Sequence, residues 1–250
     1  MKFIGIIPAR YASSRFPGKP LADMDGKPMI QRVYEQVKKS ISVVYVATDD
    51  ERIFQAVESF GGKVVMTSAN HRSGTDRCNE AYNKIGQSFD VVLNIQGDEP
   101  FISPEQIDLL KACFTDSSVE IATLVKTFDQ KDGLATLQNP STPKVVISKK
   151  SEAIYFSRSI IPFLRDVEKE DWATHHIFYK HIGIYGYRTD VLQEITQLSP
   201  GVLEQAESLE QLRWIENGYK IKVGITTHET IGIDTPEDLQ NAIRHMRIDK

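Results

Sequence analysis

Apolar runs alternate with amphipathic stretches along the first half of the chain. The apolar runs predict buried strands at residues 3–7, 43–47, 64–66, 91–95 and 121–125. Between them, apolar side chains recur at helical spacing after Pro28 and again from residue 53 to Gly61, and a more polar helix is predicted to end near residue 85. Ser103, followed by a proline and an acid, is typical of a further helix start.

Strands and helices that alternate in this way predict an α/β fold with a mostly parallel sheet covered on both faces. Ligands of such sheets bind beyond the carboxyl ends of the strands. We therefore expect the loops after Ile7, Ala47, Met66 and Ile95 to line a binding site.

The pattern changes near residues 139–140. Short strands are predicted at 144–148 and 153–156, a longer one at 181–188, and a polar segment at 165–174. We interpret roughly residues 140–200 as a β-rich insertion within a single domain spanning 1–250. Helical periodicity returns at 203–212, a strand is predicted at 219–225, and residues 234–239 open a last helix.

Composition narrows the possible functions. The chain has 250 residues and a formal net charge of -4, which argues against a dedicated nucleic-acid binder. It contains no apolar run near the eighteen or so residues of a membrane span. Only two cysteines, Cys78 and Cys113, are present, so we expect no disulfide framework and a reduced, cytoplasmic protein. The charged first ten residues do not resemble a signal peptide.

One loop departs from this mild acidity. Residues 8–20 hold Arg10, Arg15 and Lys19 and no acid, directly after the first strand. Three cations in a Gly/Ser/Pro loop suit a triphosphate, with Ser13, Ser14 and backbone N–H groups completing the cradle. A solvated basic loop would show the same composition. Neither a Walker loop nor a G-x-G-x-x-G motif after a strand is present, which disfavours P-loop ATPases and Rossmann dehydrogenases.

Two carboxylates are candidate metal ligands. Asp98 follows a predicted central strand and the turn at Gly97, and Mg²⁺ favours one or two carboxylates with water and phosphate oxygens. An ordinary acidic turn is an equally good interpretation. Asp234 precedes the last helix, where it would serve either as the N-cap or as a second metal ligand.

Two further groups of residues suit ligand binding. Ser73 and Gly74 precede a helix, so they would cap it or present backbone groups to a base or phosphate, with Arg77 one turn further on. A polyhydroxylated acid would use a cation, an aromatic and hydrogen-bonding groups, and the second half of the chain offers Arg158, His181, Tyr185, Glu210 and Gln211. Each of these is also an ordinary surface residue type. Zinc binding by His175, His176 and His181 has no supporting second motif.

Four stretches, at residues 7–21, 96–100, 181–188 and 234–239, together resemble the 3-deoxy-manno-octulosonate (Kdo) cytidylyltransferases, a branch of the sugar nucleotidyltransferases. Residues 155–158 and 209–213 add to the resemblance, which spans nearly the whole chain. It implies a Rossmann-like nucleotide-diphospho-sugar transferase fold and a homodimer built through the insertion. It also implies that CTP and Kdo react to give CMP-Kdo, for lipopolysaccharide synthesis, and pyrophosphate.

The resemblance also implies residue roles. Arg10 and Lys19 match triphosphate-binding positions, and Asp98 and Asp234 match Mg²⁺ ligands, so these four are the implied catalytic residues. The implied nucleotide-binding set is Ala9, Arg10, Ser13, Ser14, Arg15, Lys19, Arg72, Ser73, Gly74 and Gln96, with residues 72–74 facing cytosine. The implied sugar-binding set is Arg77, Gln96, Arg158, His181, Tyr185, Glu210 and Gln211. Two departures are Phe16, where Leu is commoner, and Asp76, where Glu is usual.

Three alternatives stay open. The chain would use a related acid sugar, such as an amino-Kdo or a sialic acid, with much the same residues. A glycosyltransferase of similar fold would need an Asp-x-Asp motif, whereas Asp98 is followed by Glu99 and Pro100. A non-enzymatic nucleotide sensor would have no use for both Asp98 and Asp234.

Overall fold

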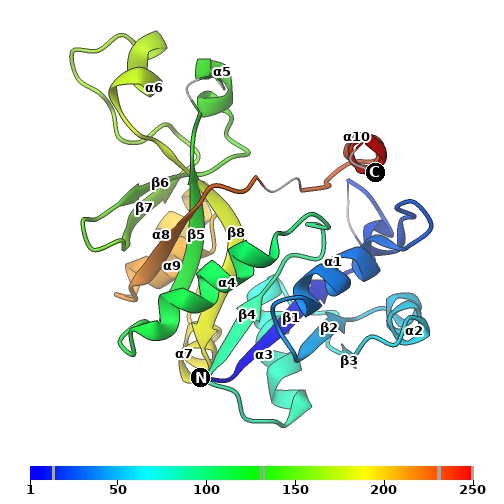
Figure 1. Cartoon of the computed structure of the whole chain (residues 1–250). Coiled ribbons are helices and arrows are strands. Elements are labelled where there is room, and N and C mark those ends of the chain that lie inside the picture. Colours follow the sequence, from blue (N-terminus) through cyan, green and yellow to red (C-terminus); the bar gives the residue numbers. More distant parts are fainter. Residues whose placement is uncertain (13–14, 130, 132, 230–231, 249–250) are drawn as a thin grey trace. The chain divides into compact units, whose positions relative to one another are not determined.

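The chain forms two compact units in the computed structural model, which describes residues 1–12, 15–129, 131, 133–229 and 232–248 (Figure 1). Unit 1 comprises Met1–Asp108, Gly186–Thr196 and Thr230–Lys250, and unit 2 comprises Leu109–Tyr185 and Gln197–Glu229. The chain therefore passes between the units four times. The predicted insertion at 140–200 falls within unit 2 except for the stretch Gly186–Thr196, which belongs to unit 1.

Unit 1 contains a parallel sheet in the strand order β3-β2-β1-β4. Its strands are β1 (Phe3–Ala9), β2 (Val44–Thr48), β3 (Val64–Met66) and β4 (Val91–Asn94). All four residues of β4 are buried, as expected for a central strand covered on both faces. The parallel arrangement brings the carboxyl ends of these strands to one edge, where the predicted ligand loops begin.

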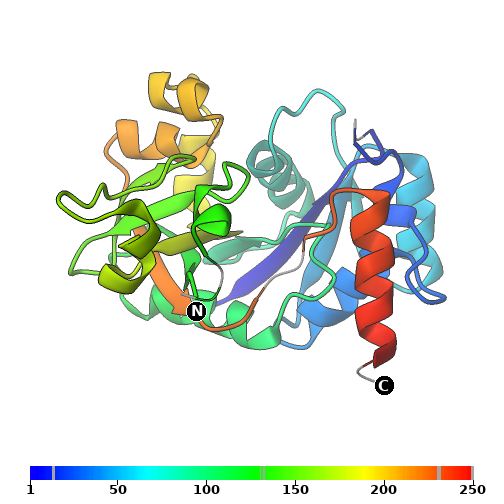
Figure 2. The same ribbon diagram turned by 90° about the horizontal axis from the view of Figure 1, so that it is seen from above.

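Helices of unit 1 follow the predicted periodicity, except for one at 189–195, a stretch where the sequence pattern predicts no helix. They are α1 (Met29–Lys38), α2 (Glu51–Ser59), α3 (Gly74–Ile85), the first part of α4 (Pro104–Ala112), α7 (Thr189–Ile195) and α10 (Pro236–Ile248). Asp50 caps α2 by accepting from the Arg52 backbone N–H at 3.0 Å. Figure 2 shows α10, coloured red, beside the blue N-terminal segment, and a cluster including Met24, Met29 and Leu239 joins the two.

Unit 2 holds the strands of the second half of the chain. They are β5 (Ile121–Thr127), β6 (Lys144–Ile147), β7 (Ala153–Ser157), most of β8 (Tyr179–Arg188) and β9 (Ile221–Thr226), in the order β8-β5-β9, with β6 against β7 and β8. Strands β5 and β9 pair in parallel, whereas β6 pairs antiparallel with both partners. The predicted short strands and the longer strand at 181–188 are thus confirmed.

Short helices of unit 2 account for most differences from the sequence prediction. They are α5 (Gly133–Gln138), α6 (Trp172–His175), α8 (Val202–Glu207) and α9 (Gln211–Glu216). The periodic stretch 203–212 is divided between α8 and α9 because Ser208 takes a left-handed conformation, φ 50°. The polar segment 165–174 is not featureless, since Trp172 packs against Phe178 and Leu137 and fixes a turn of helix there. No helix in the described part of the chain is long and apolar enough to cross a membrane.

Candidate active site

A cavity of about 520 Å³ lies in unit 1, where the segments after β1, β3 and β4 meet. Its lining residues are Pro8, Ala9, Arg10, Ala12, Arg15, Lys19, Pro20, Ser73, Gly74, Arg77, Gln96, Gly97, Asp98 and Asp234. Three of the four loops expected from the parallel sheet contribute. The loop after β2 supplies none of the described lining residues, but its Asp49 accepts a hydrogen bond from Arg77, which lines the cavity.

Lys19 is fixed by the turn that ends the basic loop. Gly18 adopts φ 73°, a conformation that favours glycine, and its N–H donates to the Tyr11 carbonyl at 2.9 Å. The Arg52 guanidinium lies 3.3 Å from the Tyr11 ring centroid and holds the ring against Gly18. This turn starts a short 3-10 helix at Lys19 and leaves only 13% of the lysine side chain exposed.

Asp98 is placed by a close approach of two main chains. After β4, Ile95 continues the ladder by donating to the Ile6 carbonyl at 3.0 Å. A Cβ at Gly97 would lie 2.9 Å from the Pro8 carbonyl oxygen, so only glycine lets the chain pass here without a shift. The Asp98 carboxylate then accepts from Lys19 Nζ at 2.6 Å.

Asp234 reaches the same lysine from the far end of the sequence. The Ile233 N–H donates to the Asp98 carbonyl at 3.0 Å, which joins the two segments through their backbones. The Asp234 carboxylate accepts from Lys19 at 3.4 Å and from both terminal nitrogens of Arg15 at 3.0 and 3.1 Å.

The interpretation of Asp234 as the cap of the last helix is wrong. Thr235 caps α10 instead, because its hydroxyl accepts from the Asp238 N–H at 3.1 Å while Asp238 accepts from the Thr235 N–H at 2.8 Å. The Asp238 carboxylate also accepts from the Thr235 hydroxyl at 2.8 Å, and this hydrogen bond, followed by those from the main-chain N–H groups of Asp234 and Thr235, lowers the pKa of Asp238. The Asp234 carboxylate is therefore available to the cavity.

The start of α3 forms another wall. Ser73 caps the helix by accepting from the Asp76 N–H at 3.1 Å, and a Cβ added at the following Gly74 would lie 3.3 Å from the Pro8 ring. Both residues line the cavity, so capping and lining are compatible here. Arg77, one turn on, is 1% exposed and donates to the Thr67 hydroxyl at 2.6 Å and to Asp49 at 2.9 Å.

Glu99, next to Asp98, is a buried carboxyl group. It is 9% exposed, and its Oε2 has no hydrogen-bond partner among the described residues. Burial, followed by the charge of Asp98, raises the pKa of Glu99 to about 8. At neutral pH the carboxyl is therefore mostly protonated, and Asp98 carries the negative charge of this pair.

Unit 2 brings together several residues that the resemblance assigns to the sugar. His181 and Tyr185, four positions apart on β8, share one face of the strand, with ring centroids 5.3 Å apart. Tyr185 in turn packs edge-on against Trp214 at 5.1 Å. Burial lowers the pKa of His181 to about 3, so its ring is neutral and shares a hydrogen bond with Thr123 at 3.0 Å.

The other unit 2 residues have different surroundings. The Arg158 guanidinium donates to three main-chain carbonyls, those of Glu207, Pro140 and Ser208, at 2.6, 2.9 and 3.1 Å. Gln211 starts α9 next to Glu210, and its buried Nε2 has no partner among the described residues. Arg158 thus clamps the turn after α8, while Gln211 keeps an unused donor.

Some sequence predictions fall elsewhere. Ser13 and Ser14 lie outside the described residues, and Arg72 is exposed and absent from the described cavity lining. His175, His176 and His181 contact Asp171, Phe178 and Thr123 respectively, and the described residues contain no cluster of three or more potential metal ligands from His, Cys, Asp and Glu. Sequence reasoning missed the supporting roles of Asp49, Thr67, Tyr11 and Arg52. Of these, Asp49 and Thr67 carried a signal, because they directly follow β2 and β3.

Comparisons with known proteins agree on one family. A cytidylyltransferase family model matches residues 4–221. The 3-deoxy-manno-octulosonate cytidylyltransferase of Parabacteroides distasonis is 68% identical over 244 residues, which are 97% of either chain. That of Phocaeicola vulgatus is 66% identical over 242 residues, 97% of this chain and 96% of the relative. The chain belongs to the 3-deoxy-manno-octulosonate cytidylyltransferase family.

Solved structures place this cytidylyltransferase among known folds. A CMP:2-keto-3-deoxy-manno-octonic acid synthetase complexed with CTP matches it with a TM-score of 0.91 and 44% identity over 100% of both chains. A putative glucose-1-phosphate thymidylyltransferase from Bacillus anthracis matches with a TM-score of 0.66 over 98% of this chain and 95% of that one, and at 19% identity it shares the fold alone. The predicted nucleotidyltransferase fold, with a central sheet flanked by helices, is confirmed.

Both departures from the family pattern have a structural setting in this cytidylyltransferase. Phe16 packs against the cluster of Met24, Met29 and Ile233, so its larger side chain faces the core under the loop. Asp76 lies in the first turn of α3, where an acid interacts favourably with the helix N-terminus, as a glutamate would.

Proposed function

We propose that this chain transfers CMP from CTP to Kdo, giving CMP-Kdo, a precursor for lipopolysaccharide, and pyrophosphate. The observation that carries the proposal is the convergence of Asp98 and Asp234 on Lys19, inside a cavity that Arg10 and Arg15 also line. With Arg77, four cationic side chains and two carboxylates line this cavity, which suits a highly charged triphosphate better than a sugar diphosphate. Family membership supplies the identity of the nucleotide and the sugar.

The proposed reaction is an in-line displacement at the α-phosphorus. A hydroxyl oxygen of Kdo bonds to the α-phosphorus, the bond from that phosphorus to the bridging oxygen breaks, and pyrophosphate leaves with the electron pair. Arg10, Arg15 and Lys19 would hold the phosphate oxygens and neutralise the growing charge on the leaving group. The proton of the hydroxyl would pass to Asp234 or to a bound water.

The two carboxylates fit a magnesium ion. One oxygen of Asp98 and one of Asp234 face the single Nζ atom of Lys19, so a cation can be reached by both groups. Two carboxylates leave room for the water and phosphate oxygens that Mg²⁺ retains. When bound, the ion would neutralise phosphate charge and lower the pKa of the attacking hydroxyl. Lys19 and Arg15 would then be free to turn toward the phosphates.

Asp98→Asn tests the proposed metal role. Removing one charge-stabilising group typically costs about 10²–10³ in kcat. The variant should also bind Mn²⁺ more weakly than the unaltered protein in the presence of CTP, as followed by electron paramagnetic resonance. Unchanged turnover together with unchanged Mn²⁺ binding would exclude Asp98 as a ligand.

The substrate is tested by omission. The protein is incubated with CTP, Mg²⁺ and Kdo while each is left out in turn, and pyrophosphate release is measured. We expect release only in the complete mixture, and weaker or no release when an amino-Kdo or a sialic acid replaces Kdo. Faster release with either substitute would reassign the sugar. Binding of CTP with no release in any mixture would favour the nucleotide sensor, and consumption of a nucleotide-sugar would favour the glycosyltransferase.

We also propose a homodimer and a cytoplasmic location. Support for the homodimer comes from the exposed large apolar side chains of unit 2, which among the described residues are Ile154, Phe163, Ile177, Val202 and Ile225. Analytical ultracentrifugation should give twice the chain mass, and Phe163→Glu should shift the equilibrium toward the monomer if Phe163 lies in the interface. The small number of cysteines remains the support for the cytoplasm.

A further inference from the structure

Glu80 gathers three partners on the side of α3. Its carboxylate accepts from the Ser68 backbone N–H at 3.0 Å, pairs with Lys84 at 2.7 Å, and contacts Nε2 of His71. Ser68 and His71 belong to the segment that leads from β3 into α3. Glu80 is absent from the described cavity lining and therefore has no direct part in the proposed chemistry.

Further hydrogen bonds tie the same segment to α3. Lys84 donates to the Met66 carbonyl at 2.9 Å, at the end of β3. The Asn70 N–H donates to the Ser68 hydroxyl at 3.1 Å. On the other side, Arg77 donates to the Thr67 hydroxyl. Residues 66–71 are thus fastened to α3 through Arg77, Glu80 and Lys84, directly before Arg72.

Burial and charge both strengthen the contacts of Glu80. The Glu80 side chain is 23% exposed and that of His71 is 19% exposed, so solvent screens them only partly. Burial alone would raise the pKa of Glu80, but the hydrogen bonds from Lys84, Ser68 and His71 outweigh it and lower the pKa to about 2. The carboxylate therefore stays ionised, and its hydrogen bonds remain charge-assisted, throughout the neutral range.

We infer that Glu80 is a positioning residue that holds residues 68–71, through Ser68 and His71, in the conformation that presents residues 72–74 to the nucleotide base. This inference rests on the proposed function and on the family resemblance, which implies that residues 72–74 face cytosine. Because Glu80 acts through the loop, its loss raises the KM for CTP and weakens the preference for CTP over UTP. The kcat at saturating CTP stays near its original value, because Lys19, Asp98 and Asp234 are untouched.

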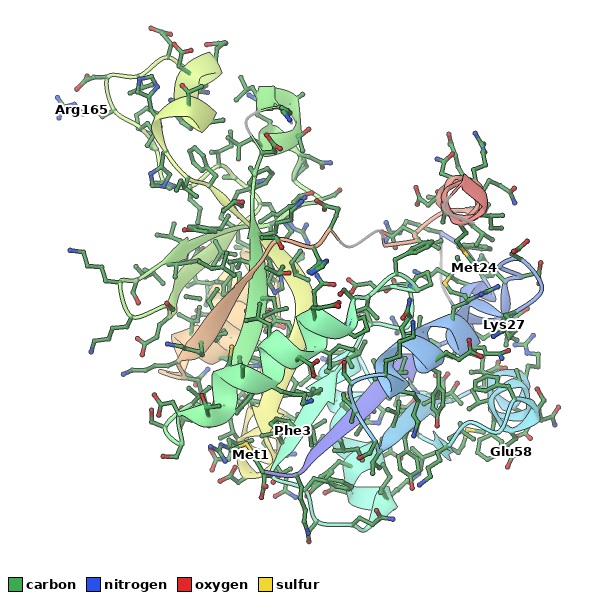
Figure 3. The ribbon with its side chains drawn as sticks, in the orientation of Figure 1. Met1, Phe3, Met24, Lys27, Glu58 and Arg165 are labelled. Atoms are coloured by element: carbon green, nitrogen blue, oxygen red, sulfur yellow. The ribbon has the colours of Figure 1, made fainter. Side chains whose placement is uncertain are left out.

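The test compares Glu80→Ala, Glu80→Gln and His71→Ala with the unaltered protein. Glu58→Gln serves as the control, since Glu58 is an exposed acid on the outer edge of α2 (Figure 3). Steady-state pyrophosphate release gives kcat and KM for CTP, UTP and Kdo, calorimetry gives the Kd of CTP, and thermal melting reports folding. Should Glu80→Ala fail to fold, Glu80→Gln retains one acceptor oxygen, and His71→Ala breaks the contact from the loop side.

Glu80→Ala should raise the KM and Kd for CTP about tenfold, the scale for losing a hydrogen bond to a charged group. His71→Ala and Glu80→Gln should have smaller effects in the same direction, with the KM for Kdo and the kcat unchanged. A lower melting temperature with unchanged KM and Kd for CTP would overturn the inference, as would a fall in kcat alone.

The calorimetric arm separates this inference from the proposed function. If the unaltered protein binds CTP but releases no pyrophosphate with Kdo, the proposed function fails and the Kd values still decide the role of Glu80. If the unaltered protein binds no CTP, both fail.

Discussion

The buried carboxyl of Glu99 makes the stability of unit 1 depend on pH in an unusual direction. A carboxyl that is more acidic in the unfolded chain than in the folded protein gives up its proton on unfolding. The pKa of Glu99 is about 8 in the folded protein, against an ordinary value of 4.5. Its stabilising contribution is therefore complete below about pH 4.5 and is lost as the pH rises through about 8.

Glu99→Gln removes this dependence while keeping the shape of the side chain. Each unit of pKa shift corresponds to about 1.4 kcal/mol, so the shift is worth on the order of 5 kcal/mol as an upper value. The amide resembles the protonated acid, and Oε2 of Glu99 has no partner to lose among the described residues. We expect the variant and the original protein to be similarly stable near pH 5, and the variant to be more stable by several kcal/mol at pH 9.

The assay must report on unit 1 alone. Trp172 and Trp214 both lie in unit 2, so tryptophan fluorescence during urea unfolding follows that unit and serves as an internal control. Hydrogen exchange of amides in α1 and α3, measured by mass spectrometry, follows unit 1. Comparing the two proteins at the same pH cancels the pH dependence of intrinsic exchange.

If the difference in hydrogen-exchange protection between Glu99→Gln and the original protein stays constant from pH 5 to pH 9, the reasoning is refuted. So would a variant that is less stable than the original at pH 9. Glu99→Gln should also keep pyrophosphate release near its original rate, because Asp98 supplies the charge in the cavity. A large fall in that rate would mean that Glu99 itself takes part in the reaction.

Two further predictions follow from close contacts and from burial. Gly97→Ala should destabilise the protein by about 1–3 kcal/mol and lower kcat/KM, because the new Cβ would press on the Pro8 carbonyl oxygen. Gly232→Ala is the control and should change neither quantity, because nothing lies within 4 Å of an added Cβ there. Urea unfolding and pyrophosphate release measure the two effects. The NMR signal of the His181 ring should not titrate between pH 5 and 9, because burial lowers its pKa to about 3. The free energy of unfolding should fall as the pH drops below about 6.5, because in that range only the unfolded chain binds a proton at His181. A titration midpoint of the folded protein near pH 6.5 would contradict the effect of burial.

Local patterns predicted most of the fold. Apolar runs located all the strands of unit 1, because a parallel strand buried on both faces needs consecutive apolar residues, as in β4. The parallel arrangement of these strands also predicted the site, because the loops that follow parallel strands meet at one edge of the sheet. Lys19 and Asp98 could be singled out for this reason, although they lie 79 residues apart.

Features that depend on tertiary contacts could not be predicted from the local sequence pattern. The left-handed conformation of Ser208 divides a stretch that has helical periodicity, and the sequence gives no sign of it, because serine rarely adopts that conformation. The burial of Arg77 with Asp49 and Thr67 could not be predicted, because arginine is usually exposed and its partners are distant in sequence. The sequence pattern predicts Asp234 as the cap of α10, and only the pairing of Thr235 with Asp238 shows that Thr235 caps this helix instead.

The distance in sequence between Lys19 and Asp234 bears on how the protein is synthesised. The two residues share a contact in the cavity although 215 positions separate them. A ribosome delivers the basic loop first and the second carboxylate only after most of the chain has emerged. In a nascent chain, Arg15 therefore stays without its Asp234 partner until residue 234 has emerged, so this ion pair is among the last contacts of the cavity to form.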